Sequence, residues 1–121
     1  AASGGPLVQH SLQVMLELAH EGLFTKEFIV EKMCHAPAKL FGVKGRGFIR
    51  KGYYADLVLI DPSETYTVTD KNILYKCGWS PFEGETFHNS INKTFINGQI
   101  AFEDGVVSEK LFGKALEFEN Y

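Results

Sequence analysis

The sequence predicts an α+β fold, with a helical segment in residues 1–44 followed by a β-rich segment in residues 45–121. Two observations carry this prediction. Apolar residues recur at helical spacing in the first segment, and short runs rich in β-branched and aromatic residues occur in the second. Helices followed by strands along one chain are typical of α+β domains or of two separate units. We therefore place a domain boundary near residue 44.

The helical segment is predicted to contain three helices separated by turn residues. The first begins at Pro6 behind a Ser3 N-cap and ends at Gly22. The second begins after Thr25, and Pro37 is expected to end it and to start a short third helix. The residues expected on the apolar face of the first helix are Val8, Leu12, Met15, Leu16 and Ala19.

The β-rich segment opens with two apolar runs, Phe48–Ile49 and Leu57–Ile60, which are expected to form strands. The second run has no polar alternation, a pattern typical of a strand buried on both faces. Leu57, Leu59 and Ile60 are therefore expected to be buried, and Val58 too if both faces are covered. Pro62 cannot donate to a strand ladder, and the strand is expected to end before it. Further on, Asn97–Gly98 lies between apolar alternations and predicts a type I′ hairpin turn.

The composition is that of a folded domain with neither a nucleic-acid nor a membrane partner. Hydrophobic residues make up 45% of the 121 residues, and the formal net charge is −3, which gives no basic surface for nucleic acid or anionic lipid. No apolar run approaches the roughly 20 residues of a membrane span. Cys34 and Cys77 form no disulfide framework, so both are expected to stay thiols in a reducing compartment, the cytoplasm.

The sequence shows no constellation of catalytic or metal-binding residues. A zinc site needs three or four converging ligands, yet the chain has no H-x-H, H-E-x-x-H or C-x-x-C pattern. Its serines lie in no G-x-S-x-G context, and its glycines form no dinucleotide-binding fingerprint. We assign no catalytic residue and no metal ligand to the chain. The histidines expected to be packing or surface residues are His10, His20, His35 and His88.

Five motifs spread over nearly the whole chain carry a family resemblance. Residues 47–62 read GFIRKGYYADLVLIDP, which resembles the point where cyclic amidohydrolases leave a (β/α)8 barrel and enter a small β domain. Residues 75–84 read YKCGWSPFEG, which narrows the resemblance to the dihydroorotases. Three further motifs, SGGP, HAPAKLFG and TFINGQIAFEDG, fit the same family in order and spacing.

The resemblance implies a fold and a chemistry for a longer parent protein. Residues 1–44 correspond to the last helices of a (β/α)8 metal-dependent hydrolase barrel, and residues 45–121 to the C-terminal part of its β-sandwich domain. The parent is expected to hold two zinc ions and to hydrolyse dihydroorotate reversibly to N-carbamoyl-L-aspartate in pyrimidine biosynthesis. In the family's order the metal ligands precede Ala1, so the chain alone is expected to bind no zinc and to be inactive.

Ser3 and Gly4 match the place of the family's substrate-binding loop. The family uses a Phe-Gly pair there, largely through backbone groups, so these two residues are expected to bind the substrate. Ser3 departs from Phe, and its interpretation as a helix N-cap stays open. In the family the first helix packs on barrel strands, so the chain alone is expected to self-associate, and the parent to be a homo-oligomer.

Three other functions stay open at this point. The parent is alternatively a related enzyme, such as a dihydropyrimidinase, hydantoinase or allantoinase, or a relative that has lost its metal ligands and serves as a structural or interaction protein. The residues that distinguish these are expected outside this chain. A third alternative, an independent β-rich binding module, is less favoured because a complete sandwich has more strands in regular alternation.

Overall fold

The computed structural model describes residues 4–110 and 113–119. It divides into two compact units, one formed by Ala1–Phe24 and Asp61–Ser90 and the other by Thr25–Ile60 and Ile91–Tyr121. Each unit therefore combines a helical segment with strands from later in the chain. Among the helices in the described ranges, none is both long and apolar enough to cross a bilayer.

Helix α1 spans Ser11–His20, so it begins later than the predicted start at Pro6. The reason is a turn before the helix, in which the His10 N–H donates to the Leu7 carbonyl at 3.2 Å. This bond takes the place of a first helical turn, and His10 becomes the N-cap without a side-chain capping bond. The predicted N-cap, Ser3, lies outside the described residues.

The C-terminus of α1 follows the prediction, whereas its apolar face does so only in part. Gly22 has φ +81, and the Leu23 N–H donates to the Leu18 carbonyl at 2.9 Å, which is the wider bond of a Schellman motif. Val8 lies before the helix and is exposed, and the buried residue of α1 is the polar Gln13. The other members of the predicted face are half-buried: Leu12, Met15, Leu16 and Ala19.

Helices α2 (Lys26–Val30), η1 (Glu31–His35) and α3 (Ala36–Leu40) follow one another without a break. Thr25 caps α2 with its side-chain oxygen, as predicted. The short third helix predicted at Pro37 is confirmed as α3, with Pro37 in its first turn, but the prediction that Pro37 interrupts the helical path before it is wrong. Element η1 is a π-helical turn, in which the hydrogen bonds span five residues instead of four. Pro37 has no N–H to donate to the preceding turn of an α-helix. The wider turn of η1 lies directly before Pro37 and lets the helical path continue through this proline.

A glycine allows the chain after α3 to pass very close to the helix. Gly47 has φ +79, and a Cβ at this position would lie 2.4 Å from the Ala38 Cβ and 2.9 Å from the Cys34 carbonyl oxygen. Only a residue without a side chain fits both the backbone angle and the space. Packing therefore requires a glycine at the first position of the motif at residues 47–62.

The expected strand at Phe48–Ile49 is wrong, because these residues lie in the loop between α3 and the first strand. The Phe48 ring stacks on the His35 ring, with centroids 4.2 Å apart and planes at 8°. The Arg50 guanidinium lies 4.3 Å from the Phe48 ring centroid. Phe48 is thus held by helix and loop side chains instead of by a strand partner, and Ile49 is exposed.

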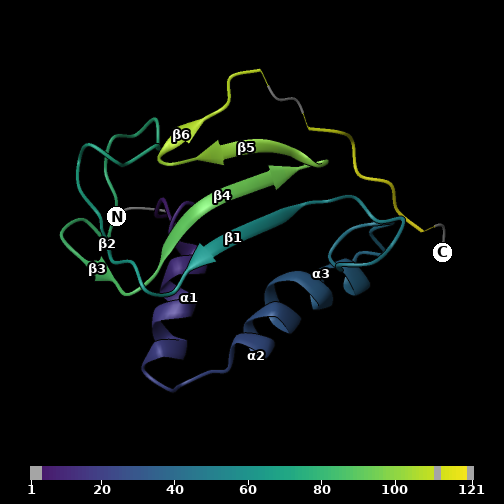
Figure 1. Ribbon diagram of the computed structural model, residues 1–121, viewed down its shortest axis with the longest axis horizontal. Coiled ribbons are helices and arrows are strands. Elements are labelled where there is room, and N and C mark those ends of the chain that lie inside the picture. Colours follow the sequence, from purple (N-terminus) through teal and green to yellow (C-terminus); the bar gives the residue numbers. More distant parts are fainter. Residues whose placement is uncertain (1–3, 111–112, 120–121) are drawn as a thin grey trace. The chain divides into compact units, whose positions relative to one another are not determined.

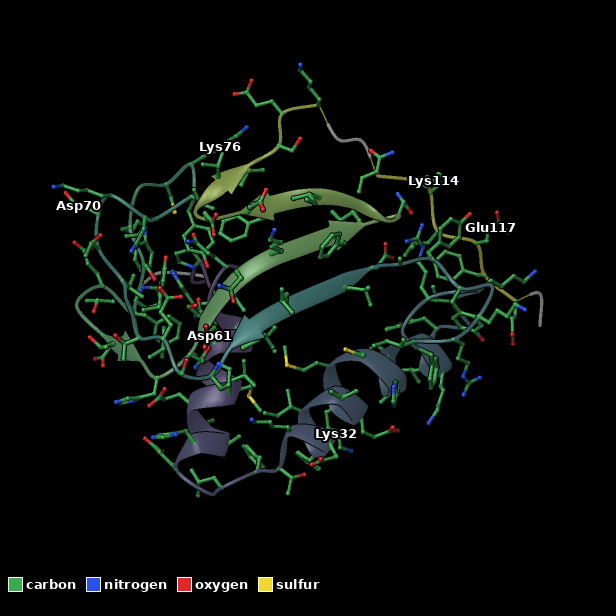
Figure 2. All side chains as sticks on the ribbon, in the orientation of Figure 1. Lys32, Asp61, Asp70, Lys76, Lys114 and Glu117 are labelled. Carbon is green, nitrogen blue, oxygen red and sulfur yellow. The ribbon has the colours of Figure 1, made fainter. Side chains whose placement is uncertain are left out.

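The C-terminal segment pairs with the start of this loop. Val43 and Phe118 form an antiparallel bridge, and the Lys44 N–H donates to the Glu117 carbonyl at 2.8 Å. Figure 2 labels Glu117 and Lys114 on this segment. Val43 and Lys44, which precede the motif at residues 47–62, are therefore held in place by Glu117 and Phe118.

Four strands form the larger sheet in the order β1-β4-β5-β6, as Figure 1 shows. Their bounds are Leu57–Asp61 for β1, Ser90–Ile96 for β4, Gln99–Glu103 for β5 and Val106–Val107 for β6. Strand β1 is the predicted apolar strand, and it ends before Pro62 as expected. Strands β4, β5 and β6 pair antiparallel through tight turns.

The predicted burial of β1 on both faces is wrong for this chain. Val58 and Leu59 are 44% and 52% exposed, and Leu57 and Ile60 are half-buried. A strand is covered on both faces only when other elements bring enough apolar surface against it. Within residues 4–110 and 113–119, too little apolar surface packs against β1 to do so.

The hairpin between β4 and β5 confirms the prediction made from Asn97–Gly98. Asn97 has φ 53 and Gly98 has φ 79, the two positive angles of a type I′ turn. Ile96 and Gln99 flank the turn as directly paired residues. The local twist of this turn fits the strands that it joins, which is why so short a signal predicts it.

Three polar side chains hold this hairpin to the segment before β1, and we call Arg46, Asp56 and Asn97 the hairpin clamp. Arg46 forms an ion pair with Asp56 and donates from Nη2 to the Asn97 Oδ1 at 2.8 Å. The Asn97 N–H donates to the Asp56 Oδ1 at 2.8 Å. Because Asp56 belongs to the resemblance motif, this part of the motif serves the fold.

Strands β2 (Tyr66–Thr67) and β3 (Thr86–Phe87) form a separate antiparallel pair. Val68, which follows β2, is fully buried. Its N–H donates to the Glu85 carbonyl, and its carbonyl accepts from the Gly84 N–H, both at 2.9 Å. This pairing joins the two ends of the long connection that carries residues 69–85.

Candidate functional site

The expected substrate-binding loop is described from Gly4 onward, and Ser3 lies outside the described residues. Gly4 is exposed and belongs to no helix or strand. A Cβ built at Gly4 or at Gly5 would meet no atom within 4 Å, so the space on the side-chain side of both residues is open. The role of Ser3 and Gly4 in binding a substrate therefore stays a prediction.

Gln9, shortly after this loop, makes three hydrogen bonds to the connection between β2 and β3. Its backbone N–H donates to the Tyr75 Oη at 2.7 Å. Its carboxamide Nε2 donates to the Asn72 carbonyl at 2.7 Å, and its Oε1 accepts from the Leu74 N–H at 2.8 Å. The carboxamide acts as donor and acceptor at once, so its orientation is fixed.

His10 lies next to Gln9 and is completely buried, with 0% exposure. Its Nδ1 is 3.3 Å from the Ser80 Oγ, which also accepts the Phe82 N–H at 3.2 Å. The aromatic rings whose centroids lie 6.0–6.3 Å from the His10 ring belong to Tyr66, Tyr75, Phe82 and Phe87. We call Gln9, His10, Tyr75 and Ser80 the loop anchor, because they join the segment after Gly4 to residues 72–84.

The environment of His10 favours its neutral form. Burial lowers the pKa of His10 below its ordinary value of 6.5, because the charged imidazolium loses its hydration. Ser80 and His10 are the residue types of a nucleophile–base pair. Their exposed fractions are only 5% and 0%, so a substrate cannot reach them. We conclude that this pair holds the fold together.

The remaining histidines each have local partners. The His20 and His88 rings stack with centroids 4.9 Å apart, and the His88 Nδ1 lies 2.7 Å from the Glu17 Oε1. Burial raises the pKa of Glu17, but the hydrogen bonds and charge of His88 and the charge of His20 outweigh it and lower that pKa. His35 pairs with Glu31 at 2.9 Å. These arrangements agree with the prediction of packing and surface histidines.

The described residues do not fit a zinc site. In residues 4–110 and 113–119, no group of three or more histidine, cysteine, aspartate or glutamate side chains is placed to hold a metal ion. Zinc in proteins takes three or four such ligands at about 2.0–2.3 Å. Cys34 and Cys77 are both free thiols.

A cavity of about 250 Å³ lies at the end of α3, away from the loop anchor in sequence. It contains two cationic side chains, but Arg46 is paired with Asp56 and Lys39 with Glu31. Its charges are thus largely compensated by neighbouring carboxylates. The lining residues are Ala38, Lys39, Gly42, Val43, Arg46, Phe48, Tyr53 and Glu119.

Sequence reasoning did not identify Gln9 as a structural link, and it assigned no partner to His10. No local signal marked them, since both residues lie inside the first helix that the sequence predicts from Pro6 onward. Their partners lie more than 60 residues further along the chain. Contacts over such separations come from tertiary packing, which a local pattern does not specify.

Known proteins resemble this chain in both sequence and fold. Residues 2–101 match the Amidohydrolase family. The solved L-hydantoinase (dihydropyrimidinase) from Arthrobacter aurescens superposes with a TM-score of 0.86 at 31% identity, over 96% of this chain and 26% of that one. The chain therefore belongs to the amidohydrolase family and has the fold of the corresponding part of a hydantoinase.

Curated relatives narrow the similarity further. A dihydroorotase from Pyrococcus furiosus is 32% identical over 115 residues, which are 95% of this chain and 28% of the relative. An allantoinase from Desulfitobacterium hafniense is 31% identical over 89% of this chain and 24% of the relative. The predicted resemblance to dihydroorotases is confirmed. The chain spans about a quarter of the length of these relatives.

Proposed function

We propose that the chain is the C-terminal part of a dihydroorotase. In this proposal, residues 1–44 are the last helices of a (β/α)8 barrel, and residues 45–121 are strands of the β-sandwich domain that follows. The observation that carries the proposal is the similarity to a dihydroorotase over 95% of the chain. The motif at residues 75–84 also supports the proposal, because it resembles dihydroorotases more than the related enzymes.

The proposed reaction opens a cyclic amide. Water adds to the ring carbonyl of dihydroorotate, the ring carbon–nitrogen bond breaks, and the nitrogen takes a proton, giving N-carbamoyl-L-aspartate. In the full-length protein, a cytoplasmic enzyme of pyrimidine biosynthesis in this proposal, residues outside this chain would hold two zinc ions, which would supply a hydroxide nucleophile near neutral pH. The contribution of this chain is substrate binding through the backbone at Ser3 and Gly4.

A related cyclic amide is the second candidate substrate. The similarity to an allantoinase and the superposition on an L-hydantoinase both favour it. In this proposal, all of these enzymes break an amide bond in a ring, and they differ in which ring they bind. Discrimination between rings depends on contacts in the substrate pocket, and one unmatched polar group there changes selectivity strongly.

The test is a steady-state assay of the full-length protein on three substrates: dihydroorotate, allantoin and a 5-substituted hydantoin. We expect kcat/KM to be highest for dihydroorotate. A higher value for allantoin or hydantoin would move the assignment to that substrate class. A well-folded protein that binds no zinc and turns over none of the three would favour a structural or interaction protein that has lost its metal ligands instead.

A further inference from the structure

We propose that Gln9, His10 and Tyr75 are positioning residues that fix the backbone of the Gly4 loop for substrate binding. The expected effect on kinetics rests on the proposed function. The expected effect on the loop backbone is independent of the proposed function. The inference is based on the difference between the surroundings of Gly4 and Gly5 and those of Gln9 and His10. Gly4 and Gly5 have no packing neighbour within 4 Å of a Cβ position, while Gln9 and His10 are tightly bound.

The connection between the loop and its anchor is short and stiff. Pro6 has a fixed φ, and the turn closed by the His10 N–H and the Leu7 carbonyl shortens the path. Pro6 and this turn therefore restrict the chain between Gly4 and Gln9, and Gly5 is the one residue there without a side chain to limit its backbone angles. We expect a displacement of Gln9 to be passed on to the Gly4 backbone through Pro6 and this turn, since the space at the Cβ positions of Gly4 and Gly5 is open.

The chemistry of the anchor fixes orientation as well as distance. The three bonds of Gln9 run in different directions, to the Tyr75 Oη, the Asn72 carbonyl and the Leu74 N–H. Apolar contacts alone are non-directional, whereas hydrogen bonds in a partly buried site define one geometry. The buried His10 ring then holds this segment among aromatic side chains.

Tyr75→Phe gives the sharpest test, because it removes one hydrogen-bond acceptor and keeps the ring that packs on His10. Gln9→Leu is the second variant, since it keeps the size of the side chain and removes both carboxamide bonds. The matched control is Thr67→Val, which removes the 2.8 Å bond between the Thr67 and Thr86 hydroxyls and touches no anchor residue.

The kinetic experiment uses the full-length protein with dihydroorotate. We expect Tyr75→Phe to raise KM roughly 3–10-fold with little change in kcat, since the loss of one hydrogen bond weakens binding that ground state and transition state share. Gln9→Leu should raise KM further, and Thr67→Val should leave it unchanged. An unchanged KM in both anchor variants would overturn the inference, as would an equal rise in the control.

A second experiment separates this inference from the proposed function. Amide hydrogen exchange of residues 4–8 in the same full-length proteins, followed by mass spectrometry, needs no substrate. We expect both anchor variants to exchange faster there than the wild type and Thr67→Val. Faster exchange without dihydroorotate turnover by the wild type would reject the substrate and keep the positioning role. Unchanged exchange in both variants would reject the positioning role whatever the substrate.

Discussion

The hairpin clamp and the loop anchor each hold one connection of the chain, but they do so by different physical means. In the clamp, the charged side chains of Arg46 and Asp56 pair with each other and with the turn residue Asn97. In the anchor, the neutral carboxamide of Gln9 and the buried ring of His10 bond to a connection rich in aromatic residues.

The difference assigns separate tasks to the two motifs that carry the family resemblance. The motif at residues 47–62 supplies Asp56 to the clamp, where it fixes a hairpin. The motif at residues 75–84 supplies Tyr75 and Ser80 to the anchor, which lies beside the Gly4 loop. A charged contact should respond to salt, and a buried histidine should respond to acid.

The largest expected effect comes from removing the ring at the centre of the anchor. His10→Ala should lower the free energy of unfolding by about 3–5 kcal/mol, because it empties a fully buried aromatic position. His35→Ala is the matched control, and the loss of its half-buried stacking on Phe48 should cost about 1 kcal/mol. Urea unfolding followed by circular dichroism measures both, and equal losses would contradict the contrast between the two histidines.

A comparably large effect is expected where the chain passes α3. Gly47→Ala should cost about 2–5 kcal/mol, made up of about 1–2 for the left-handed backbone and about 1–3 for the forced contacts. Gly52→Ala is the control, because its φ of +87 is similar but its surroundings are open. It should therefore show only the backbone part. The same loss of unfolding free energy in both variants would mean that the contact with Ala38 and Cys34 is relieved by movement.

A smaller effect distinguishes the clamp from the anchor through salt. Asp56→Asn should cost about 1–2 kcal/mol at low salt, since it weakens charge-assisted bonds that are partly accessible to solvent. This cost should shrink in 1 M NaCl, where the screening length falls to about 3 Å. The cost of His10→Ala should not change with salt. Equal salt dependence of the two variants in urea unfolding would refute this assignment of charged and neutral contacts.

The most gradual effect concerns acid. Burial lowers the pKa of His10 below 6.5, so the unfolded chain binds this proton at a higher pH than the folded chain does. Stability should therefore be fully present above about pH 6.5 and decline as the pH falls from there through the lowered pKa. In His10→Gln, which does not titrate, this part of the decline should disappear. Unfolding midpoints at pH 7.5 and 5.5 give the comparison, and an unchanged pH dependence would count against a buried neutral His10.

Local chemistry was predictable from the sequence wherever the signal and the structure occupy the same few residues. The Asn97–Gly98 turn, the Thr25 cap and the Gly22 helix end are all fixed by backbone angles and adjacent hydrogen bonds. Each needs no information from distant parts of the chain. The family motifs were readable for the same reason, because they are contiguous.

The rest depends on partners that are distant in sequence. Pro37 was expected to end a helix, but a π-helical turn before it lets the helix continue. Leu59 was expected in a core, yet its burial depends on elements that the described residues do not place against it. In the candidate site, Gly4 and Ser3 came from the resemblance alone, and the anchor at Gln9 and His10 emerged only from tertiary contacts.

We propose that the residues of this chain support the reaction and do not themselves perform it. The most direct test is a zinc-supplemented assay that follows dihydroorotate loss with the purified 121-residue chain beside the full-length protein. We predict metal-dependent turnover by the full-length protein and none by the 121-residue chain, because positioning a loop gives no acceleration without the groups that stabilise the transition state. Metal-dependent turnover by the 121-residue chain would contradict the claim.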